Sequence, residues 1–154
     1  SGMAEEYDLF TPDVGELAFL ADDQAPHPFY TRGFILHEDQ KVPHLISRAY
    51  AHRNAARRLL VKGKIDYLAG PQGVIATIDQ PSEEALEPIG GTGDTLTGMV
   101  ASLVEAGSDL EGAALTAARA NRLAGCLASP SPRTQVGDII DRIPQAIAQG
   151  RGAT

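Results

Sequence analysis

The sequence lacks the residues that would cross-link the chain or fix it in a membrane. Among its 154 residues there is one cysteine, Cys126, and no tryptophan, which excludes a disulfide framework and a cysteine-rich metal site within one chain. No apolar run reaches the length of about 20 residues that a helix needs to cross a bilayer. No leader-like segment is evident. We therefore expect a cytoplasmic protein with no membrane as its partner.

An excess of positive charge is also absent. The chain carries 13 Lys and Arg against 20 Asp and Glu, a formal net charge of -7, and such a surface disfavours nucleic acid as the main partner. The four histidines show neither the i,i+4 spacing nor the close grouping of a zinc site. The composition therefore favours small molecules as partners, and no metal site built from protein ligands is expected.

What the chain does have is the composition and length of one folded domain. Apolar residues make up 43% and charged residues 21% of the sequence, values that are typical of globular proteins. The length suits one compact domain with its own core. We expect this domain over residues 1–149 and a flexible tail over residues 150–154.

Apolar periodicity predicts a mixture of strands and helices. The stretch "YDLFTPDVGELAFLADD" predicts the end of a strand, a turn and a helix, and residues 24–43 predict a long loop. Residues 42–60 predict one helix with a proline in its first turn, and two β-type runs around "GPQG" predict a hairpin. Further helices are expected over about residues 94–106, 110–128 and 136–149. The pattern indicates an α/β fold with helices flanking a layered sheet.

A glycine-rich turn precedes the first of these later helices. In "EPIGGTGDTLTG" three glycines surround Thr92 immediately before the helix expected at Asp94. Bare backbone at a helix N-terminus can approach an anion, because the first N–H groups are unpaired and the helix dipole is positive there. The alternative is that Thr92 or Asp94 simply caps the helix, with the glycines supplying positive φ angles.

Two well-known phosphate-binding patterns do not fit this turn. No Lys follows the glycines, as it would in a Gly-Lys-Ser/Thr phosphate loop, and the glycines lack the GxGxxG spacing of dinucleotide sites. Asp94 is the acid of interest, because the positive end of a helix dipole keeps a carboxylate ionised. Such a carboxylate can accept a proton from a substrate hydroxyl, so Asp94 is a candidate general base.

Four stretches, in order along the chain, resemble one family. "GGTGDTLTGMVASLVEAG" is similar to the glycine-rich signature of the ribokinase-like superfamily, and its "GTGDTLTG" form is closest to the ADP/ATP-dependent NAD(P)H-hydrate dehydratases. "TPDVGELA" resembles that family's Thr-Pro-His-Pro-Gly-Glu motif, "LLVKGKIDYLAGPQGV" its Val-Leu-Lys-Gly strand and hairpin, and "VGDIIDRIPQAI" its closing helix. The resemblance implies a partial ribokinase-like layered sheet with flanking helices.

The resemblance also implies roles for the matching residues. In that family the glycine-rich turn holds the transferred phosphate and its Asp is the base, which is Asp94 here. The residues implied to contact nucleotide phosphates are Gly91, Thr92, Gly93, Lys62 and Gly63. Those implied to face the substrate or a magnesium-water shell are Thr11, Asp13 and Glu16. Two alternatives stay open: Lys62 as an exposed lysine at a strand end, and Glu16 as a helix-start residue stabilised by the dipole.

The chain departs from the family pattern in two places. Asp13 and Val14 stand where the family motif has His and Pro, and about ten residues precede the Thr-Pro pair where the family has a large N-terminal portion. If Ser1 and Gly2 are a cloning remnant and Met3 is the native start, the chain corresponds to the C-terminal half of the fold. We then expect a homo-oligomer or a separate N-terminal partner chain, because the exposed sheet edge needs covering.

The function that the resemblance implies is dehydration of hydrated NAD(P)H driven by ATP or ADP with Mg²⁺. In that chemistry the nucleotide phosphorylates the extra hydroxyl group, and loss of phosphate restores the ring. A related kinase acting on a small alcohol or sugar is a second implied activity. A non-catalytic homologue that serves as a partner or regulatory subunit is the alternative from another class.

Overall fold

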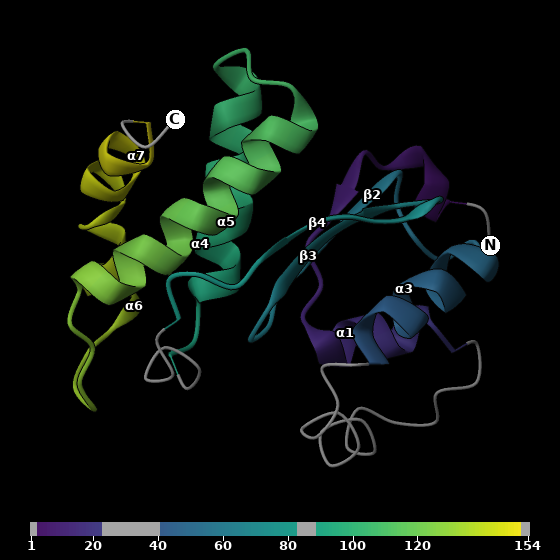
Figure 1. Cartoon of the computed structure of the whole chain (residues 1–154), viewed down its shortest axis with the longest axis horizontal. Coiled ribbons are helices and arrows are strands. Elements are labelled where there is room, and N and C mark those ends of the chain that lie inside the picture. The colour runs from purple at the N-terminus through teal and green to yellow at the C-terminus, as the bar shows by residue number, and fades with distance from the viewer. Residues whose placement is uncertain (1–2, 23–40, 83–88, 152–154) are drawn as a thin grey trace. The chain divides into compact units, whose positions relative to one another are not determined.

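The computed structural model describes residues 3–22, 41–82 and 89–151 of the chain (Figure 1). The chain divides into two compact units, Ser1–Thr77 and Ile78–Thr154. Most of the loop expected over residues 24–43 lies outside the described residues, and its last two positions are helical. The sequence prediction of one domain over residues 1–149 stays a prediction.

The first unit contains a four-stranded mixed sheet. After a short 3-10 helix, η1 (Ala4–Glu6), its elements are β1 (Leu9–Phe10), α1 (Val14–Leu20), α3 (Val42–Ala51), β2 (Arg58–Val61), β3 (Asp66–Gly70) and β4 (Gly73–Ile78). The strand order is β1-β2-β3-β4, with β1 parallel to β2 and β2 antiparallel to β3. The expected α/β class, with helices flanking a sheet, is confirmed, and so is the hairpin at "GPQG".

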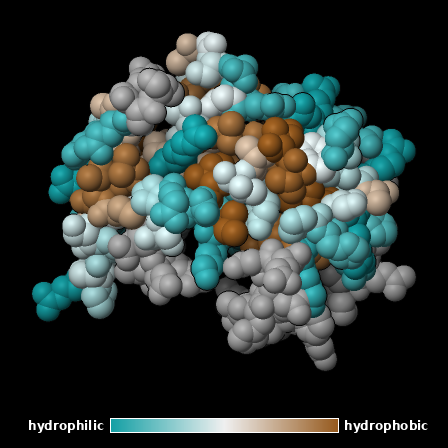
Figure 2. Space-filling view, viewed as in Figure 1, coloured by the Kyte–Doolittle hydropathy of each residue, from teal (hydrophilic) through white to brown (hydrophobic). Residues whose placement is uncertain are grey.

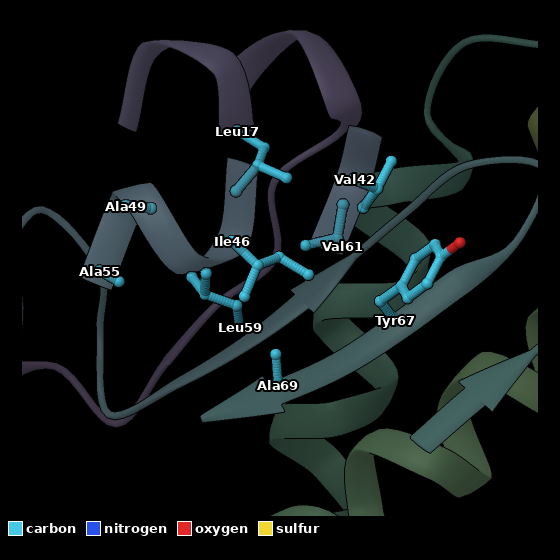
Figure 3. Close-up of a cluster of buried hydrophobic side chains, with 9 residues drawn as sticks. All are labelled: Leu17, Val42, Ile46, Ala49, Ala55, Leu59, Val61, Tyr67 and Ala69. Atoms are coloured by element: carbon cyan, nitrogen blue, oxygen red, sulfur yellow. The ribbon is translucent and has the colours of Figure 1, made fainter. Parts of the chain in front are cut away.

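The core of this unit lies between the sheet and the helices α1 and α3 (Figure 3). Leu59 and Val61 of β2 face the helices, and their partners across β3 are Ala69 and Tyr67. Leu60 alternates to the opposite face, as the two-residue period of a strand requires, and is fully buried there. The complete cluster is Leu17, Val42, Ile46, Ala49, Ala55, Leu59, Val61, Tyr67 and Ala69.

The helix predicted over residues 42–60 is wrong beyond Ala51. The α3 helix ends where Arg53 takes a left-handed backbone conformation, with φ of 58°. The N–H groups of Arg53 and Asn54 then donate to the carbonyls of Tyr50 and Ala49, which closes the helix. The alanines and arginines that follow are good helix formers. Their composition therefore predicted a continuing helix and gave no sign that α3 ends or that β2 begins.

The second unit is helical. It contains α4 (Thr92–Glu105), α5 (Leu110–Leu127), α6 (Val136–Ile140) and α7 (Ile143–Arg151). The α5 helix contacts α4, α6 and α7. Small buried side chains allow this close packing: Ala113, Ala114, Ala117, Ala118, Ala120 and Ala124. The predictions of α4 and α5, with the stop at Gly107, are confirmed.

The single closing helix expected over residues 136–149 is wrong, because two helices replace it. A turn at Asp141 and Arg142 separates α6 from α7. Pro144 is the physical reason: it has no N–H to donate to the carbonyl of Ile140, and its ring would clash with that carbonyl in a continuous helix. The α7 helix also extends to Arg151, past the start of the expected tail at residue 150.

Apolar side chains reach the surface in places among hydrophilic ones (Figure 2). In the first unit they include Val74 and Ile75, which are 40% and 47% exposed on the edge strand β4. Successive strand residues point to opposite faces, so β4 presents an apolar side chain on each face of the sheet.

Candidate functional site

The first unit brings the "TPD" and "VKG" stretches together. The parallel register of β1 and β2 continues past Phe10, so that Asp13 forms a bridge with Lys62. The Lys62 N–H donates to the carbonyl of Pro12 at 2.9 Å. Both stretches therefore lie at the carboxyl ends of two neighbouring parallel strands, which is where open α/β sheets bind ligands.

Asp13 and Glu16 form a capping box at the start of α1. The Asp13 N–H donates to Oε2 of Glu16 at 2.8 Å, and the Glu16 N–H donates to Oδ1 of Asp13 at 2.7 Å. This reciprocal pair satisfies N–H groups that a helix start leaves unpaired. The geometry supports the helix-start role for Glu16 that the sequence left open, and the role of both carboxylates toward a substrate stays a prediction. Thr11 lies half-buried just after β1.

Lys62 and Gly63 follow the end of β2. Lys62 is half-buried, and the Gly63 N–H donates to Oδ1 of Asp66 at 3.1 Å. A Cβ added to Gly63 would lie 3.2 Å from Cγ2 of Val14, so the turn passes close to the start of α1. Asp66 is only 7% exposed; it orders this turn, and sequence reasoning missed it. Its signal was an acidic residue three positions after Gly63, at the first position of an apolar strand.

The glycine-rich turn lies in the second unit and opens α4. Gly91 is the N-cap residue with φ of 93°, and having no side chain it makes no cap hydrogen bond; among the described residues no other side chain caps the helix. The Thr92 hydroxyl donates instead to the carbonyl of Ile89 at 3.4 Å, and the Thr95 N–H donates to the Gly91 carbonyl at 3.0 Å. Neither Thr92 nor Asp94 therefore makes the capping bond that the alternative interpretation required.

This open start distinguishes α4 from the next helix in the same unit. Asp109 caps α5 by accepting the Gly112 N–H at 2.8 Å. The α4 helix has 14 residues, and Asp94 is exposed in its first turn. Uncapped N–H groups and the helix dipole together favour an anion at this end.

The sequence-predicted residues thus form two groups. Unit 1 brings together Thr11, Asp13, Glu16, Lys62 and Gly63 at the carboxyl ends of β1 and β2. Unit 2 holds Gly91, Thr92, Gly93 and Asp94 in the turn and first residues of α4.

No group of three or more His, Cys, Asp or Glu side chains suited to a metal ion occurs within residues 3–22, 41–82 and 89–151. Mg²⁺ does not need such a cage, because it is often held by one or two carboxylates, water and substrate phosphates. The exposed carboxylate of Asp94, beside an open helix start, fits a magnesium-nucleotide complex of this kind. Over the same described ranges, no helix is both long and apolar enough to cross a membrane.

The fold and these residues define an α/β protein with candidate ligand-binding residues at strand ends and at a helix start. Comparison with known proteins narrows this class. Residues 3–145 match the carbohydrate kinase family described as NAD(P)H-hydrate dehydratase. The chain belongs to this family, which confirms the predicted resemblance and agrees with a partial ribokinase-like fold.

Two relatives have curated descriptions. The chain is 43% identical over 148 residues to the uncharacterized protein MJ1337 of Methanocaldococcus jannaschii, covering 96% of this chain. It is 29% identical over 141 residues to the bifunctional NAD(P)H-hydrate repair enzyme Nnr of Pyrobaculum aerophilum, covering 90% of this chain. The alignments span 64% and 25% of the lengths of these relatives.

The two adjacent glycines of the turn make a matched test of its geometry. Gly91 has a positive φ, and a Cβ there would lie 3.2 Å from Cγ2 of Val136, whereas a Cβ at Gly90 meets nothing within 4 Å. We expect Gly91→Ala to lower the free energy of unfolding by about 1–3 kcal/mol. Gly90→Ala should change it by less than about 0.5 kcal/mol. Urea unfolding of both variants measures the difference, and equal effects would contradict the conformation of the turn.

Proposed function

We propose that the chain binds an adenine nucleotide, ATP or ADP, together with Mg²⁺ at the turn formed by Gly91, Thr92 and Gly93. The observation that carries the proposal is the start of α4, where a left-handed glycine stands at the N-cap and no side chain of the described residues caps the first helical turn. Family membership supports it, because the family is described as NAD(P)H-hydrate dehydratase. The proposed substrate is accordingly the hydrated form of NADH or NADPH.

The nucleotide supplies the phosphoryl group that turns the extra hydroxyl of the hydrate into a leaving group. Backbone N–H groups at the start of α4 donate hydrogen bonds to phosphoryl oxygens and stabilise the negative charge that develops on them. The Asp94 carboxylate accepts the proton of the substrate hydroxyl as its oxygen bonds to the terminal phosphorus of the nucleotide. The bond from that phosphorus to the bridging oxygen breaks, and ADP leaves when ATP is the donor, or AMP when ADP is. Departure of phosphate, with loss of a ring proton, then restores the reduced nicotinamide.

The residues of the first unit have proposed binding roles. The Lys62 ammonium has the right charge for nucleotide phosphates. The Gly63 N–H donates to Oδ1 of Asp66, so Gly63 is proposed to contribute close approach of the backbone, as a residue without a side chain allows. Thr11, Asp13 and Glu16 are proposed to face the substrate or the water shell of Mg²⁺. Because Asp13 and Glu16 already accept backbone N–H groups, each would use its remaining lone pairs for such contacts.

Titration calorimetry with magnesium-ATP and magnesium-ADP tests the nucleotide site. We expect saturable binding by the wild-type chain and its loss in Gly93→Val, because a branched side chain obstructs the approach of phosphate to the first turn of α4.

Gly98→Val is the matched control. It places the same side chain later in α4, at a position where an added Cβ meets nothing within 4 Å, and it should bind nucleotide as the wild type does. The melting temperatures of both variants, from thermal unfolding, check that the fold is kept. Absence of binding at millimolar nucleotide, or equal loss in the two variants, would rule the site out.

Turnover assays separate the two chemistries that the family suggests. Recovery of reduced cofactor absorbance from the hydrate, dependent on nucleotide, supports the dehydratase. A stable phosphorylated alcohol or sugar without cofactor recovery would identify a small-molecule kinase instead. The proposed homo-oligomer is a separate question. Light scattering of the purified protein gives its molar mass, and a monomer would count against the homo-oligomer and leave the separate partner chain.

A further inference from the structure

A cavity of about 500 Å³ lies at the C-terminal end of α3 in the first unit. Its apolar wall includes Tyr50, Ala55, Ala56 and Pro71. The Tyr50 hydroxyl donates to the Ala69 carbonyl at 3.2 Å, and burial raises the pKa of Tyr50 to about 12. The ring is therefore held in place and uncharged. The cavity is open to solvent on one side, and its lining combines apolar side chains with a few polar groups, as small-molecule sites do.

Two arginines, Arg53 and Arg57, provide most of the charge of the cavity. Arg53 donates from Nε and Nη2 to Glu5, at 3.0 and 2.7 Å, and Arg57 donates from Nη1 to Asp8 at 2.9 Å. Each guanidinium has five N–H donors. Nη1 of Arg53 and both Nε and Nη2 of Arg57 have no partner among the described residues. These remaining donors can bind the oxygens of an anion in a bidentate manner.

The backbone of Arg53 is a second and independent observation. Its φ of 58° places a long side chain in the left-handed region that favours glycine. The ion pair with Glu5 is 68% exposed on the arginine side, and exposed pairs of this kind add little to stability. The left-handed backbone closes α3, whereas the only side-chain contact of Arg53 among the described residues is this exposed pair. A long cationic side chain at a strained position is common at ligand sites.

The cavity is separate from the groups proposed to bind nucleotide in the same unit. It lies where β2 begins, next to Arg57, whereas Lys62 follows the end of β2. A strand advances about 3.3 Å per residue. The four residues of β2 therefore separate the cavity, at the start of this strand, from Lys62, just after its end. A ligand in the cavity would not occupy the position at which Lys62 is proposed to contact phosphate.

We propose that this cavity binds a small molecule in which an oxyanion group, a carboxylate or a phosphate, is joined to an apolar or aromatic body. The oxyanion binds the unused donors of Arg53 and Arg57, and the body packs on Tyr50 and Pro71. Glu5 lies at the same edge and competes for Arg53. The site is independent of the proposed nucleotide chemistry, and its test does not use turnover.

Phenyl phosphate is a suitable probe, followed through the backbone amide shifts of the chain in nuclear magnetic resonance titrations. We expect saturable shifts over residues 50–57, and tighter binding than inorganic phosphate or phenol gives alone. Arg53→Gly should weaken binding at least about tenfold, because it removes a charge-assisted bidentate contact. It should also keep or raise the melting temperature, because glycine adopts the positive φ without strain.

Arg48→Ala is the matched control, since it removes a nearby cation, on α3, that does not line the cavity. It should bind the probe as the wild type does, and Glu5→Gln should bind it more tightly. Arg57→Gln gives a second loss of affinity that does not depend on the folding of Arg53→Gly. Shifts confined to the start of α4, no saturation at millimolar probe, or equal weakening by Arg48→Ala would each overturn the proposal.

Discussion

Replacing Asp94 with Asn is expected to lower the nucleotide-driven turnover of hydrated NAD(P)H by about 10²–10⁴-fold, the usual contribution of a general base. The amide cannot accept the proton of the substrate hydroxyl, whereas the N–H groups at the start of α4 remain. Nucleotide affinity should therefore change much less than the rate. Steady-state kinetics on the hydrate and calorimetric titration with nucleotide measure the two quantities on the same preparation.

Glu105→Gln is the control for this experiment. Glu105 is an exposed acid at the opposite end of the same helix, so its replacement makes the same charge change without touching the turn. It should leave turnover unchanged. Wild-type turnover in Asp94→Asn would show that Asp94 is not the base, even if calorimetry continued to support the nucleotide site.

Replacing Leu59 with Ala is expected to lower the free energy of unfolding by about 2–5 kcal/mol, as large-to-small changes in a packed core do. Leu59 is fully buried between α3 and the sheet. Its cross-strand partner is Ala69, which is too small to fill the space that would be left. Urea unfolding followed by circular dichroism gives the change.

Ile75→Ala removes the same number of carbon atoms from a position that is 47% exposed on β4. We expect it to cost less than about 1 kcal/mol, mostly through the lower strand preference of alanine. If the two variants were equally destabilised, the space between α3 and the sheet would not be the core of the first unit.

The sequence predicted those elements whose periodicity ends at a clear stop signal. The α4 helix repeats apolar residues up to Gly107, and the hairpin carries its turn residues between two β-type runs. The failures occur where local preference and tertiary packing disagree. Alanine and arginine favour helix beyond Ala51, yet Leu59 and Val61 stabilise the sheet by burial against α3.

The sequence predicted which residues belong to the candidate site better than it predicted which of them contact one another. Motif resemblance selected Asp13, Glu16, Lys62 and the turn before Asp94, but only the parallel register of β1 and β2 shows that Asp13 adjoins Lys62. The capping box was readable from an acid followed three residues later by glutamate. The cavity beside Arg53 was not, because it depends on how segments distant in the sequence pack together.

The link between Asp13 and Lys62 runs through the main chain, which affects what a substitution at position 13 would change. Main-chain pairing joins the two strand ends, with the Lys62 N–H on the Pro12 carbonyl, and main-chain bonds are indifferent to the side chain at position 13. A different side chain at position 13 would therefore leave Lys62 in register. Substitution at this position would leave the strand pairing in place and would act on the start of α1, which the Asp13 carboxylate caps.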